Sequence, residues 1–339
     1  MEYLSAMKYQ VLLFYKYVTI ADPQAFAEWI RERGTTLGFK GRILVAEEGL
    51  NGILEGEISQ TEIFAKELLE NPLFSDMNIK RSEGNGEAFP RWSVKVRHEI
   101  VGTQFSYDEA DPRVRTAPHL SPEKLREMYE RDEDFIVVDM RNSFEIASGK
   151  FKKTVDPGMV ASRDLKEAVV KLEKYKDKKV ITVCTGGVRC EKMSAYLLNK
   201  GFKDVYQLEN GIHAYMEKYP GKDFMGALYT FDDRIVMDFG GDREIIGECH
   251  LCKEKTERYI NCANDECHLH ILVCETCSPD RKNAYCSKKC KAHNAALARK
   301  AKLDDWLAPA KKQLQRLRYR AIKRYHRALW FIRRLKKSA

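Results

Sequence analysis

The chain has 339 residues, a formal net charge of +9 at pH 7 and 44% hydrophobic residues. This length is enough for two or three domains with a sizeable core. No run approaches the roughly 20 apolar residues that span a bilayer, and the apolar run from Val11 to Tyr15 is too short for a secretory signal. We therefore expect a soluble, cytoplasmic protein rather than a membrane or secreted one.

Residues 1–101 alternate between strand and helix periodicities. Their β-α-β-β-α-β order predicts a ferredoxin-like sandwich. That fold serves many purposes, so the order alone indicates no function. Strands are predicted at Tyr9–Thr19, Gly41–Ala46, Gly52–Glu55, Met77–Lys80 and Trp92–Val101, and helices at Pro23–Leu37 and Ser59–Asn71.

Two features of this domain have alternative interpretations. The segment EEGLNG at residues 47–52 is either a loop that faces a catalytic pocket or a hairpin turn that uses Gly and Asn for their backbone freedom. Arg91, Lys95 and Arg97 are candidates for phosphate contacts, or they belong to a solvated sheet face.

The central region begins after a polar, proline-containing segment, residues 102–120, which we expect to be a linker. Ser121, Pro122 and Glu123 then supply an N-cap, a first-turn proline and an acid near the positive end of a helix. Strands and helices alternate over residues 121–228, as expected for a parallel sheet with helices on its faces. Residues 229–248 are expected to form a second linker.

The most informative stretch of this region is VITVCTGGVRCEK, residues 180–192. Its first four residues predict a buried strand, Gly186 and Gly187 a tight loop, and the residues from Glu191 onward a helix. Cys184 therefore lies at a strand-to-helix corner. Backbone N–H groups and a helix N-terminus at such a corner favour thiolate over thiol.

Cys184 is accordingly our candidate nucleophile, and the alternative is a buried cysteine that only packs. Arg189 adds a bidentate cation suited to an oxyanion, a persulfide or a phosphate. Packing alone does not explain two glycines and an arginine at these offsets. Cys190 is either a resolving thiol that forms a disulfide with an oxidised Cys184 or a residue that packs at the base of the helix.

The spacing Cys-x-x-Gly-x-Arg resembles the active-site loop of rhodanese-fold sulfurtransferases, whereas the tyrosine-phosphatase loop places its arginine one residue later. Asp139 and Arg141, in DMRNSFE, resemble the Asp-x-Arg-x-x-x-Glu signature at the edge of the rhodanese pocket. Residues 205–215 resemble the final strand and glycine turn of that fold. One departure is the segment GKFKKT at residues 149–154, where Gly-His-Ile-Pro-Gly-Ala is usual.

A closer resemblance is to the rhodanese-like tRNA uridine hydroxylases. It is carried by CTGGVRCEK at 184–192, GRILVAEEGLNG at 41–52 and VKVRHEIV at 94–101. The resemblance implies a rhodanese-like catalytic domain over residues 121–228, tRNA as the partner, and hydroxylation of C5 of the wobble uridine with molecular oxygen. No flavin, nicotinamide or iron motif is recognisable. The alternatives are a sulfurtransferase that carries a persulfide on Cys184 and a noncatalytic RNA-binding adaptor.

Residues 249–293 form a cysteine-rich segment in which paired thiolates suit two structural, tetrahedral zinc sites. In a cross-braced arrangement the first pair shares an ion with the third and the second with the fourth; the runner-up is sequential pairing, and a third possibility is metal-free thiols. The histidines among them, His250, His268, His270 and His293, are expected to lie outside the ligand sets. The four pairs are Cys249 with Cys252, Cys262 with Cys267, Cys274 with Cys277, and Cys286 with Cys290.

Residues 294–339 predict a basic amphipathic helix, with twelve Lys and Arg and no Asp or Glu from Trp306 onward. This tail has four alternative interpretations. It binds RNA phosphates, lies on an anionic membrane, docks on another protein, or is a solvated charged helix without a partner. The sequence thus predicts an α/β and α+β multidomain chain of unknown oligomeric state, with a ferredoxin-like domain, a rhodanese-like domain, a small zinc module and a basic helix. The candidate RNA contacts in the tail are Arg316, Arg320, Lys323, Arg324 and Arg327.

Overall fold

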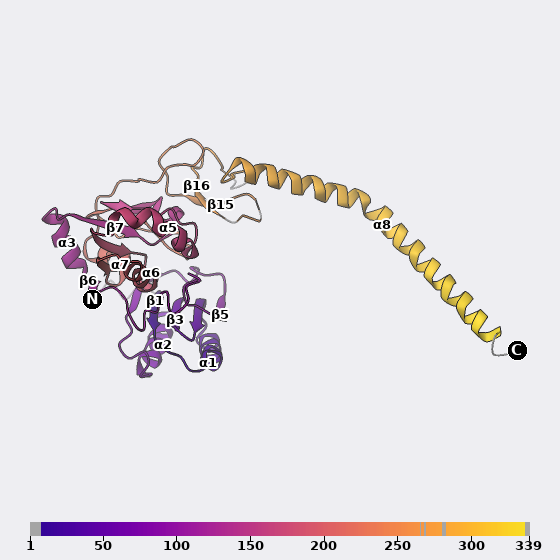
Figure 1. Cartoon of the computed structure of the whole chain (residues 1–339), viewed down its shortest axis with the longest axis horizontal. Helices are drawn as coiled ribbons and strands as arrows, with labels where there is room; N and C mark the ends of the chain where they lie inside the picture. The colour runs from indigo at the N-terminus through magenta and orange to yellow at the C-terminus, as the bar shows by residue number, and fades with distance from the viewer. Residues whose placement is uncertain (1–7, 265, 268, 280–282, 336–339) are drawn as a thin grey trace. The chain divides into compact units, whose positions relative to one another are not determined.

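The computed structural model describes residues 8–264, 266–267, 269–279 and 283–335. The chain divides into two compact units, one containing residues 1–259 and 272–274 and the other residues 260–271 and 275–339. Figure 1 labels most of their helices and several of their strands. Among the helices of the described residues, none is both long enough and apolar enough to cross a membrane.

The N-terminal domain is a five-stranded sheet in the order β4-β1-β3-β2-β5. The first four strands pair antiparallel, and β5 joins β2 in parallel. With its two helices this arrangement confirms the predicted ferredoxin-like sandwich, extended by one edge strand. The elements are β1 (Tyr9–Tyr17), α1 (Pro23–Thr36), β2 (Lys40–Ala46), β3 (Gly49–Glu57), α2 (Ile58–Glu70), β4 (Ile79–Gly84) and β5 (Trp92–Val96).

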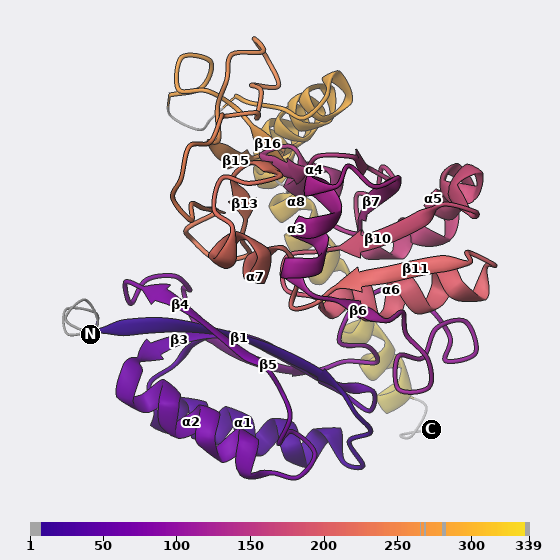
Figure 2. The same cartoon turned by 90° about the vertical axis from the view of Figure 1, so that its left-hand side faces the viewer.

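Both helices cover one face of this sheet, as Figure 2 shows. Successive side chains of a strand point to opposite faces. Leu12 and Phe14 of β1 therefore pack into the core under the helices. Val11 and Leu13 point to the other face, which an isolated sandwich would expose to water. Apolar residues on both sides of β1 indicate that a second layer covers the sheet.

Three predicted boundaries in this domain are wrong. The strand predicted at Met77–Lys80 is Ile79–Gly84, because Met77 packs in the helix-covered core instead of pairing. The last strand ends at Val96, and the Ile100 N–H donates to the Glu48 carboxylate at 2.9 Å. β3 begins at Gly49, since pairing with both β1 and β2 supports nine residues despite the glycines.

The central domain is a parallel five-stranded sheet in the order β6-β11-β10-β7-β9. It confirms the predicted rhodanese-like α/β architecture. A small antiparallel pair, β8 with β12, accompanies this sheet. The elements are β6 (His119–Leu120), α3 (Pro122–Glu130), β7 (Phe135–Asp139), α4 (Ser143–Ile146), β8 (Gly149–Phe151), β9 (Thr154–Val155), α5 (Leu165–Leu172), β10 (Lys179–Val183), α6 (Val188–Asn199), β11 (Asp204–Leu208), α7 (Gly211–Lys218) and β12 (Phe224–Gly226).

Neighbouring residues of β10 enter different cores because both faces of this sheet carry helices. Val180 packs with residues of α5 and α6, including Leu172 and Met193. Ile181 packs with residues of α3 and α7, including Leu125. The strand that leads into the Cys184 loop is therefore fixed from both sides.

The two segments expected to be linkers, residues 102–120 and 229–248, both pack as parts of the folded domains. Phe105 stacks on Tyr196 with ring centroids 4.3 Å apart, and Ala117 is also buried in the central core. The second segment contains all but the first residue of the hairpin of β13 (Leu228–Tyr229) and β14 (Val236–Met237). The apolar residues of these two segments are irregularly spaced, so the segments show no helix or strand periodicity in the sequence.

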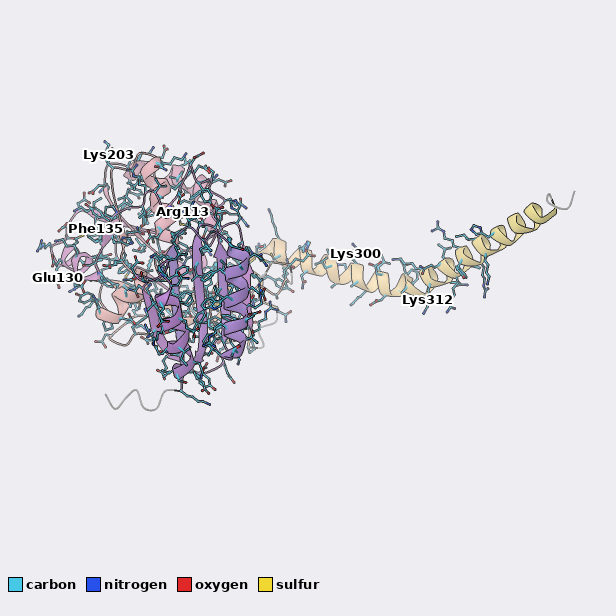
Figure 3. All side chains as sticks on the ribbon, turned by 90° about the horizontal axis from the view of Figure 1, so that it is seen from below. Arg113, Glu130, Phe135, Lys203, Lys300 and Lys312 are labelled. Carbon is cyan, nitrogen blue, oxygen red and sulfur yellow. The ribbon has the colours of Figure 1, made fainter. Side chains whose placement is uncertain are left out.

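The second unit contains most of a two-stranded sheet, β15 (Tyr259–Asn261) with β16 (His270–Leu272), and the helix α8 (Lys288–Leu335). This helix begins before the predicted start at residue 294 and includes Pro309, which removes one backbone hydrogen bond. Lysines project along it, as Lys300 and Lys312 do in Figure 3. Its apolar residues Leu314 and Ile322 are exposed.

Candidate active site

Cys184 lies directly after β10, in a four-residue loop that ends where α6 begins at Val188. The Gly187 N–H donates to the Cys184 sulfur at 3.2 Å. The start of α7 holds the same loop, because the Ile212 N–H donates to the Cys184 carbonyl at 2.9 Å. The sulfur is therefore held at a strand-to-helix corner by backbone groups.

The two cysteines at this corner have opposite protonation preferences. Burial raises the pKa of Cys184, but a hydrogen bond from the Cys190 thiol, the charge of Arg189 and nearby backbone N–H groups outweigh it and lower that pKa to about 6. Burial and the neighbouring Cys184 raise the pKa of Cys190 well above its usual range. Near neutral pH Cys184 is thus a thiolate and Cys190 a neutral donor beside it.

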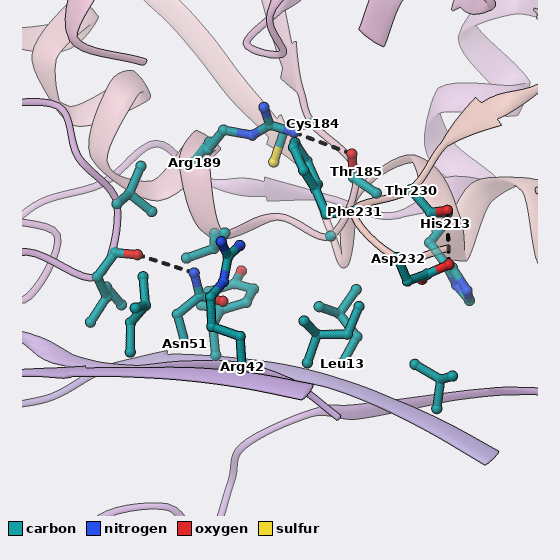
Figure 4. Close-up of a pocket in the computed structure, with 18 of the residues that line it drawn as sticks. Leu13, Arg42, Asn51, Cys184, Thr185, Arg189, His213, Thr230, Phe231 and Asp232 are labelled. Atoms are coloured by element: carbon teal, nitrogen blue, oxygen red, sulfur yellow. Dashed lines mark hydrogen bonds between the residues drawn. The ribbon is translucent and has the colours of Figure 1, made fainter. Parts of the chain in front are cut away.

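Arg189 is held by a carboxylate rather than left open for an anion. Its Nη1 and Nη2 donate to the two Glu145 oxygens at 2.7 and 2.8 Å, and Nη2 also donates to the Thr185 hydroxyl at 3.2 Å. Figure 4 shows Arg189 beside Cys184 and Thr185. The bidentate fork expected to bind an anion is therefore already occupied, although the guanidinium charge still stabilises the thiolate.

Asp139 and Arg141 form a fully buried ion pair at 2.7 Å. Arg141 also donates to the Gly149 carbonyl at 2.7 Å, so the pair ties the end of β7 to β8. Neither residue lines the cavity at Cys184 within the described chain. They were expected at the pocket edge, and Arg141 instead donates to the Glu145 carbonyl at 3.4 Å, so it holds the segment that carries Glu145.

The two loop glycines are needed because β1 of the ferredoxin-like domain lies against the loop. A Cβ on Gly186 would come within 2.9 Å of Leu13. Gly187 has φ +106°, which side-chain-bearing residues rarely adopt, and a Cβ there would meet the Tyr15 hydroxyl at 2.7 Å. The glycines thus allow close approach of a second domain.

Buried polar contacts join the same domain to the first turns of α6. Lys192 is fully buried and donates to Glu48 at 2.7 Å and to Glu99 at 2.8 Å. Lys80, whose pKa burial lowers to about 8, donates to the Gly186 carbonyl at 3.0 Å. Glu48 belongs to the segment 47–52, in which Glu47 and Glu48 turn between β2 and β3 and residues 49–52 begin β3. Both alternatives for this segment hold in part, because it makes the hairpin turn and its Asn51 lines the cavity at Cys184.

A cavity of about 300 Å³ lies between the Cys184 loop and the open face of the ferredoxin-like sheet. The sheet contributes an apolar floor, and the segment around β13 and β14 closes another side (Figure 4). Among the residues that line it are Val11, Leu13, Arg42, Leu44, Asn51, Ile53, Cys184, Thr185, Arg189, His213, Phe231, Asp232 and Arg234.

Comparison with known proteins finds a match for each of the three parts of the chain that line the cavity. Family models match in three consecutive blocks: a UPF0176 acylphosphatase-like domain at residues 9–100, a rhodanese-like domain at 121–218 and a rhodanase C-terminal domain at 225–291. A tRNA uridine(34) hydroxylase of Cytophaga hutchinsonii is 40% identical over 84% of this chain and 90% of its own length. The chain belongs to the tRNA uridine(34) hydroxylase family.

Two further members of that family show the same breadth of similarity. The protein of Staphylococcus carnosus is 42% identical over 85% of this chain and 91% of its own length. The protein of Corynebacterium kroppenstedtii is 37% identical over 82% of this chain and 97% of its own length. The resemblance drawn from the sequence motifs is thereby confirmed.

Several residues at this hydroxylase-family site were not predicted. Arg42, Phe231 and Arg234 line the cavity. Arg42 lies in the motif at residues 41–52 but was given no role there, and Phe231 and Arg234 lie outside the motifs. The apolar residues on both faces of β1 were the signal in the sequence from which a second layer on this sheet could have been predicted. No comparable local signal marked Phe231, because it lies in a segment without periodicity.

The predicted RNA contacts of this family member are not among the residues that line the cavity. Arg91, Lys95 and Arg97 are exposed at and beside β5. Arg316, Arg320 and Lys323 are exposed on α8, and the side chains of Arg324 and Arg327 lie outside the described residues.

The eight late cysteines form two groups whose sulfur atoms each lie within 4.8 Å of one another. The grouping joins the first pair with the third and the second with the fourth, which matches the cross-braced alternative and not the sequential one. Either group could hold a metal ion. One group is Cys249, Cys252, Cys274 and Cys277, and the other is Cys262, Cys267, Cys286 and Cys290.

Proposed function

We propose that this chain hydroxylates C5 of uridine 34 in tRNA with molecular oxygen as cosubstrate, and that Cys184 is its nucleophile. Membership of the tRNA uridine(34) hydroxylase family supports the reaction. The observation that carries the role of Cys184 is a thiol of lowered pKa that opens onto a cavity of about 300 Å³. Such a volume suits one small ligand, here a nucleotide turned out of its stack.

The proposed chemistry begins when the Cys184 thiolate adds to C6 of the uracil ring. The electron pair of the C5–C6 double bond moves toward C5 and the O4 carbonyl, which makes C5 electron-rich. The electron pair at C5 then bonds to one atom of oxygen, and a proton on the outer oxygen atom gives a C5 hydroperoxide. Loss of the C5 proton and of the Cys184 thiolate from C6 restores the double bond.

Oxygen must also receive two electrons, because one of its atoms enters the product and the other leaves as water. The released Cys184 thiolate takes the outer oxygen of the hydroperoxide, which breaks the O–O bond and leaves 5-hydroxyuridine and a sulfenic acid on Cys184. The Cys190 thiol then displaces water from that sulfenic acid and forms a disulfide. The reaction balances: uridine, oxygen and two thiols yield 5-hydroxyuridine, water and one disulfide. The hydrogen bond between the two thiol groups supports this pairing. Multiple turnovers then require an external reductant, whereas a single turnover does not.

The function is tested by nucleoside mass spectrometry on tRNA from cells that lack the protein. Complementation with the wild-type chain should restore 5-hydroxyuridine and its derivatives, and Cys184→Ala should not. Persistence of these nucleosides without the protein would contradict the proposal.

A second candidate is rhodanese-type sulfur transfer, favoured by the match of residues 121–218 to the rhodanese-like domain. In that case Cys184 would carry a persulfide. Incubation with thiosulfate should then add the mass of one sulfur to the Cys184 peptide. Loss of a thiolated nucleoside in the same deletion strain would favour this function over hydroxylation.

We further propose that both cysteine groups hold structural zinc. Sulfur atoms of Cys252 and Cys274 are 3.6 Å apart, as are those of Cys267 and Cys286. Tetrahedral zinc with Zn–S bonds of about 2.3 Å places its sulfurs about 3.8 Å apart. Four thiolates close each site, so zinc would stabilise the local fold and take no part in hydroxylation.

The basic helix α8 is proposed to attract tRNA through its phosphates. Its exposed Arg316, Arg320 and Lys323 fall in a segment without acidic residues. Attraction of this kind is independent of base sequence and weakens with salt. A role in the cytoplasm fits both a tRNA substrate and ten free cysteines.

A further inference from the structure

Arg42 differs from the other two arginines that line the cavity. Arg189 is bound by Glu145, and Arg234 donates to Asp232 at 2.7 and 2.8 Å. Arg42 is exposed, and within the described part of the chain no hydrogen bond or ion pair engages its side chain. Among the described residues, Arg42 is therefore the arginine of this cavity whose guanidinium has no carboxylate partner.

The position of Arg42 follows from its strand. It lies in β2 on the sheet face that also carries Leu44, so its side chain leaves the sheet toward the cavity. In Figure 4 Arg42 extends from the sheet toward the side where Cys184 and Arg189 lie. The charge is thus held opposite the reactive sulfur.

Phe231 provides an apolar surface beside that sulfur. Its ring is 44% exposed although it lines the cavity, and the Arg189 guanidinium lies 5.6 Å from its centroid. Nucleobases stack on exposed aromatic rings of this kind, whatever the base. A base stacked on Phe231 would lie next to Cys184 (Figure 4).

We propose that Arg42 binds a phosphate of the nucleotide whose pyrimidine base stacks on Phe231 beside Cys184. This rests on the proposed function and assigns the anion-binding half of the same site. A guanidinium without a carboxylate partner matches a phosphate in charge and geometry. The anion cannot favourably lie at the thiolate, because like charges repel and the Arg189 charge there is already shared with Glu145.

The test is protection of Cys184 from alkylation, which does not depend on hydroxylation. In the wild-type chain, uridine 5′-monophosphate should slow iodoacetamide labelling of Cys184 at a concentration roughly tenfold lower than uridine does. In Arg42→Gln the two ligands should protect at similar concentrations, whereas Arg42→Lys should keep part of the difference. Equal protection in the wild type, or an undiminished difference in Arg42→Gln, would overturn the proposal.

Lys40→Gln is the matched control. Lys40 is an exposed cation two residues earlier on the same strand and the same face. It is not among the residues that line the cavity, and within the described chain its ammonium donates to the Gly86 carbonyl alone. The nucleotide should keep its advantage over uridine in this variant. If Lys40→Gln lost as much of the nucleotide's advantage as Arg42→Gln does, the advantage would come from general surface charge. That result would overturn the assignment of Arg42.

Kinetics on full-length tRNA give a second readout. Arg42→Gln should raise KM roughly tenfold with kcat changed less than about twofold, since uniform binding is lost. A fall in kcat at constant KM would overturn a phosphate-binding role. Absence of any 5-hydroxyuridine with the wild-type enzyme would instead reject the proposed function, and the protection experiment would still decide the role of Arg42.

Discussion

At the scale of single residues, the lowered pKa of Cys184, on which its proposed reactivity rests, follows from a balance between burial and surrounding donors. The sulfur is fully buried, which alone favours the neutral thiol. Cys190, Arg189 and loop N–H groups reverse that preference. Glu145 holds the Arg189 guanidinium in place. The positive charge of Arg189 therefore stabilises the Cys184 thiolate while the guanidinium stays bound to Glu145.

This balance predicts the pH dependence of Cys184 alkylation. Since the pKa is lowered to about 6, the thiolate fraction should rise through that pH and stay nearly constant above pH 7.5. The rate should fall as pH decreases below 6, because the protonated thiol is not nucleophilic. Peptide mass spectrometry of iodoacetamide-treated protein measures the profile. A midpoint near the ordinary cysteine value of about 8.5 would contradict the account.

Gly187→Ala tests the contact between the loop and β1. Both φ +106° and the nearby Tyr15 hydroxyl oppose the new methyl group. Gly201→Ala is the control, because Gly201 has φ +86° but nothing within 4 Å of its Cβ position. We expect the free energy of unfolding to fall by about 1 kcal/mol more for Gly187→Ala than for Gly201→Ala. Equal losses in urea titrations would show that the contact is unimportant.

At the scale of elements, α6 joins the reactive loop to the ferredoxin-like domain. Lys192 lies in its second turn and is enclosed by two carboxylates, Glu48 from the β2–β3 hairpin and Glu99 from the segment after β5. These partners are 144 and 93 residues away in the chain. The helix is therefore oriented by a domain far from it in sequence.

Lys192→Met should lower the free energy of unfolding by about 3 kcal/mol, because it leaves two carboxylates without their buried cation. The pairing lowers the pKa of Glu99 even though burial opposes it. This contribution is present above the unfolded carboxylate pKa and is lost as pH falls, so the difference from wild type should shrink below about pH 4. Urea unfolding as a function of pH measures both effects.

Lys203→Met provides the comparison for that variant. Its side chain is 76% exposed and pairs with an equally exposed Asp177. Exposed pairs contribute little, so the change should stay within about 0.5 kcal/mol. A comparable loss in both variants would argue against a special role for the buried cluster.

Local chemistry explains which parts of the site were predictable. The strand, the two glycines and the helix around Cys184 are contiguous, so their sequence shows the corner directly. The cluster of Lys192 with Glu48 and Glu99 depends on how two domains meet, and no local pattern specifies that. Strand ends at Ile79 and Val96 were missed for a similar reason, since tertiary pairing decides where a strand stops.

At the scale of the whole molecule, the cavity needs both the rhodanese-like domain and the ferredoxin-like sheet. The rhodanese-like domain supplies Cys184, and the sheet supplies Arg42, Asn51 and an apolar floor. The order of the domains and the rhodanese-like loop were predictable from the sequence. Arg42 and Phe231 were not, because facing the cavity is a property of the assembled domains.

The grouping of the cysteines predicts how paired substitutions affect zinc content. Cys249→Ser with Cys274→Ser removes two ligands of one group, so one zinc per chain should remain. Cys249→Ser with Cys262→Ser removes one ligand from each group, so both sites should weaken and less than one zinc should remain. Metal analysis of the purified full chain distinguishes them. The reverse result would support sequential pairing.

The basic helix predicts a salt-dependent contribution to tRNA affinity. The full-length variant Arg316→Gln/Arg320→Gln/Lys323→Gln should bind tRNA more weakly at low salt. The slope of log affinity against log salt should become shallower by up to about three, roughly one for each phosphate that the variant no longer neutralises. Fluorescence anisotropy with labelled tRNA measures this slope, and an unchanged slope would exclude phosphate binding by these residues.

The central claim is that Cys184 attacks C6 of uridine 34. We would incubate the full chain with tRNA that carries 5-fluorouridine at that position, because fluorine at C5 blocks loss of a proton and should leave the adduct trapped. Peptide mass spectrometry should then find the nucleotide attached to Cys184. An adduct on another residue, or no adduct with a preparation that hydroxylates unmodified tRNA, would contradict the account.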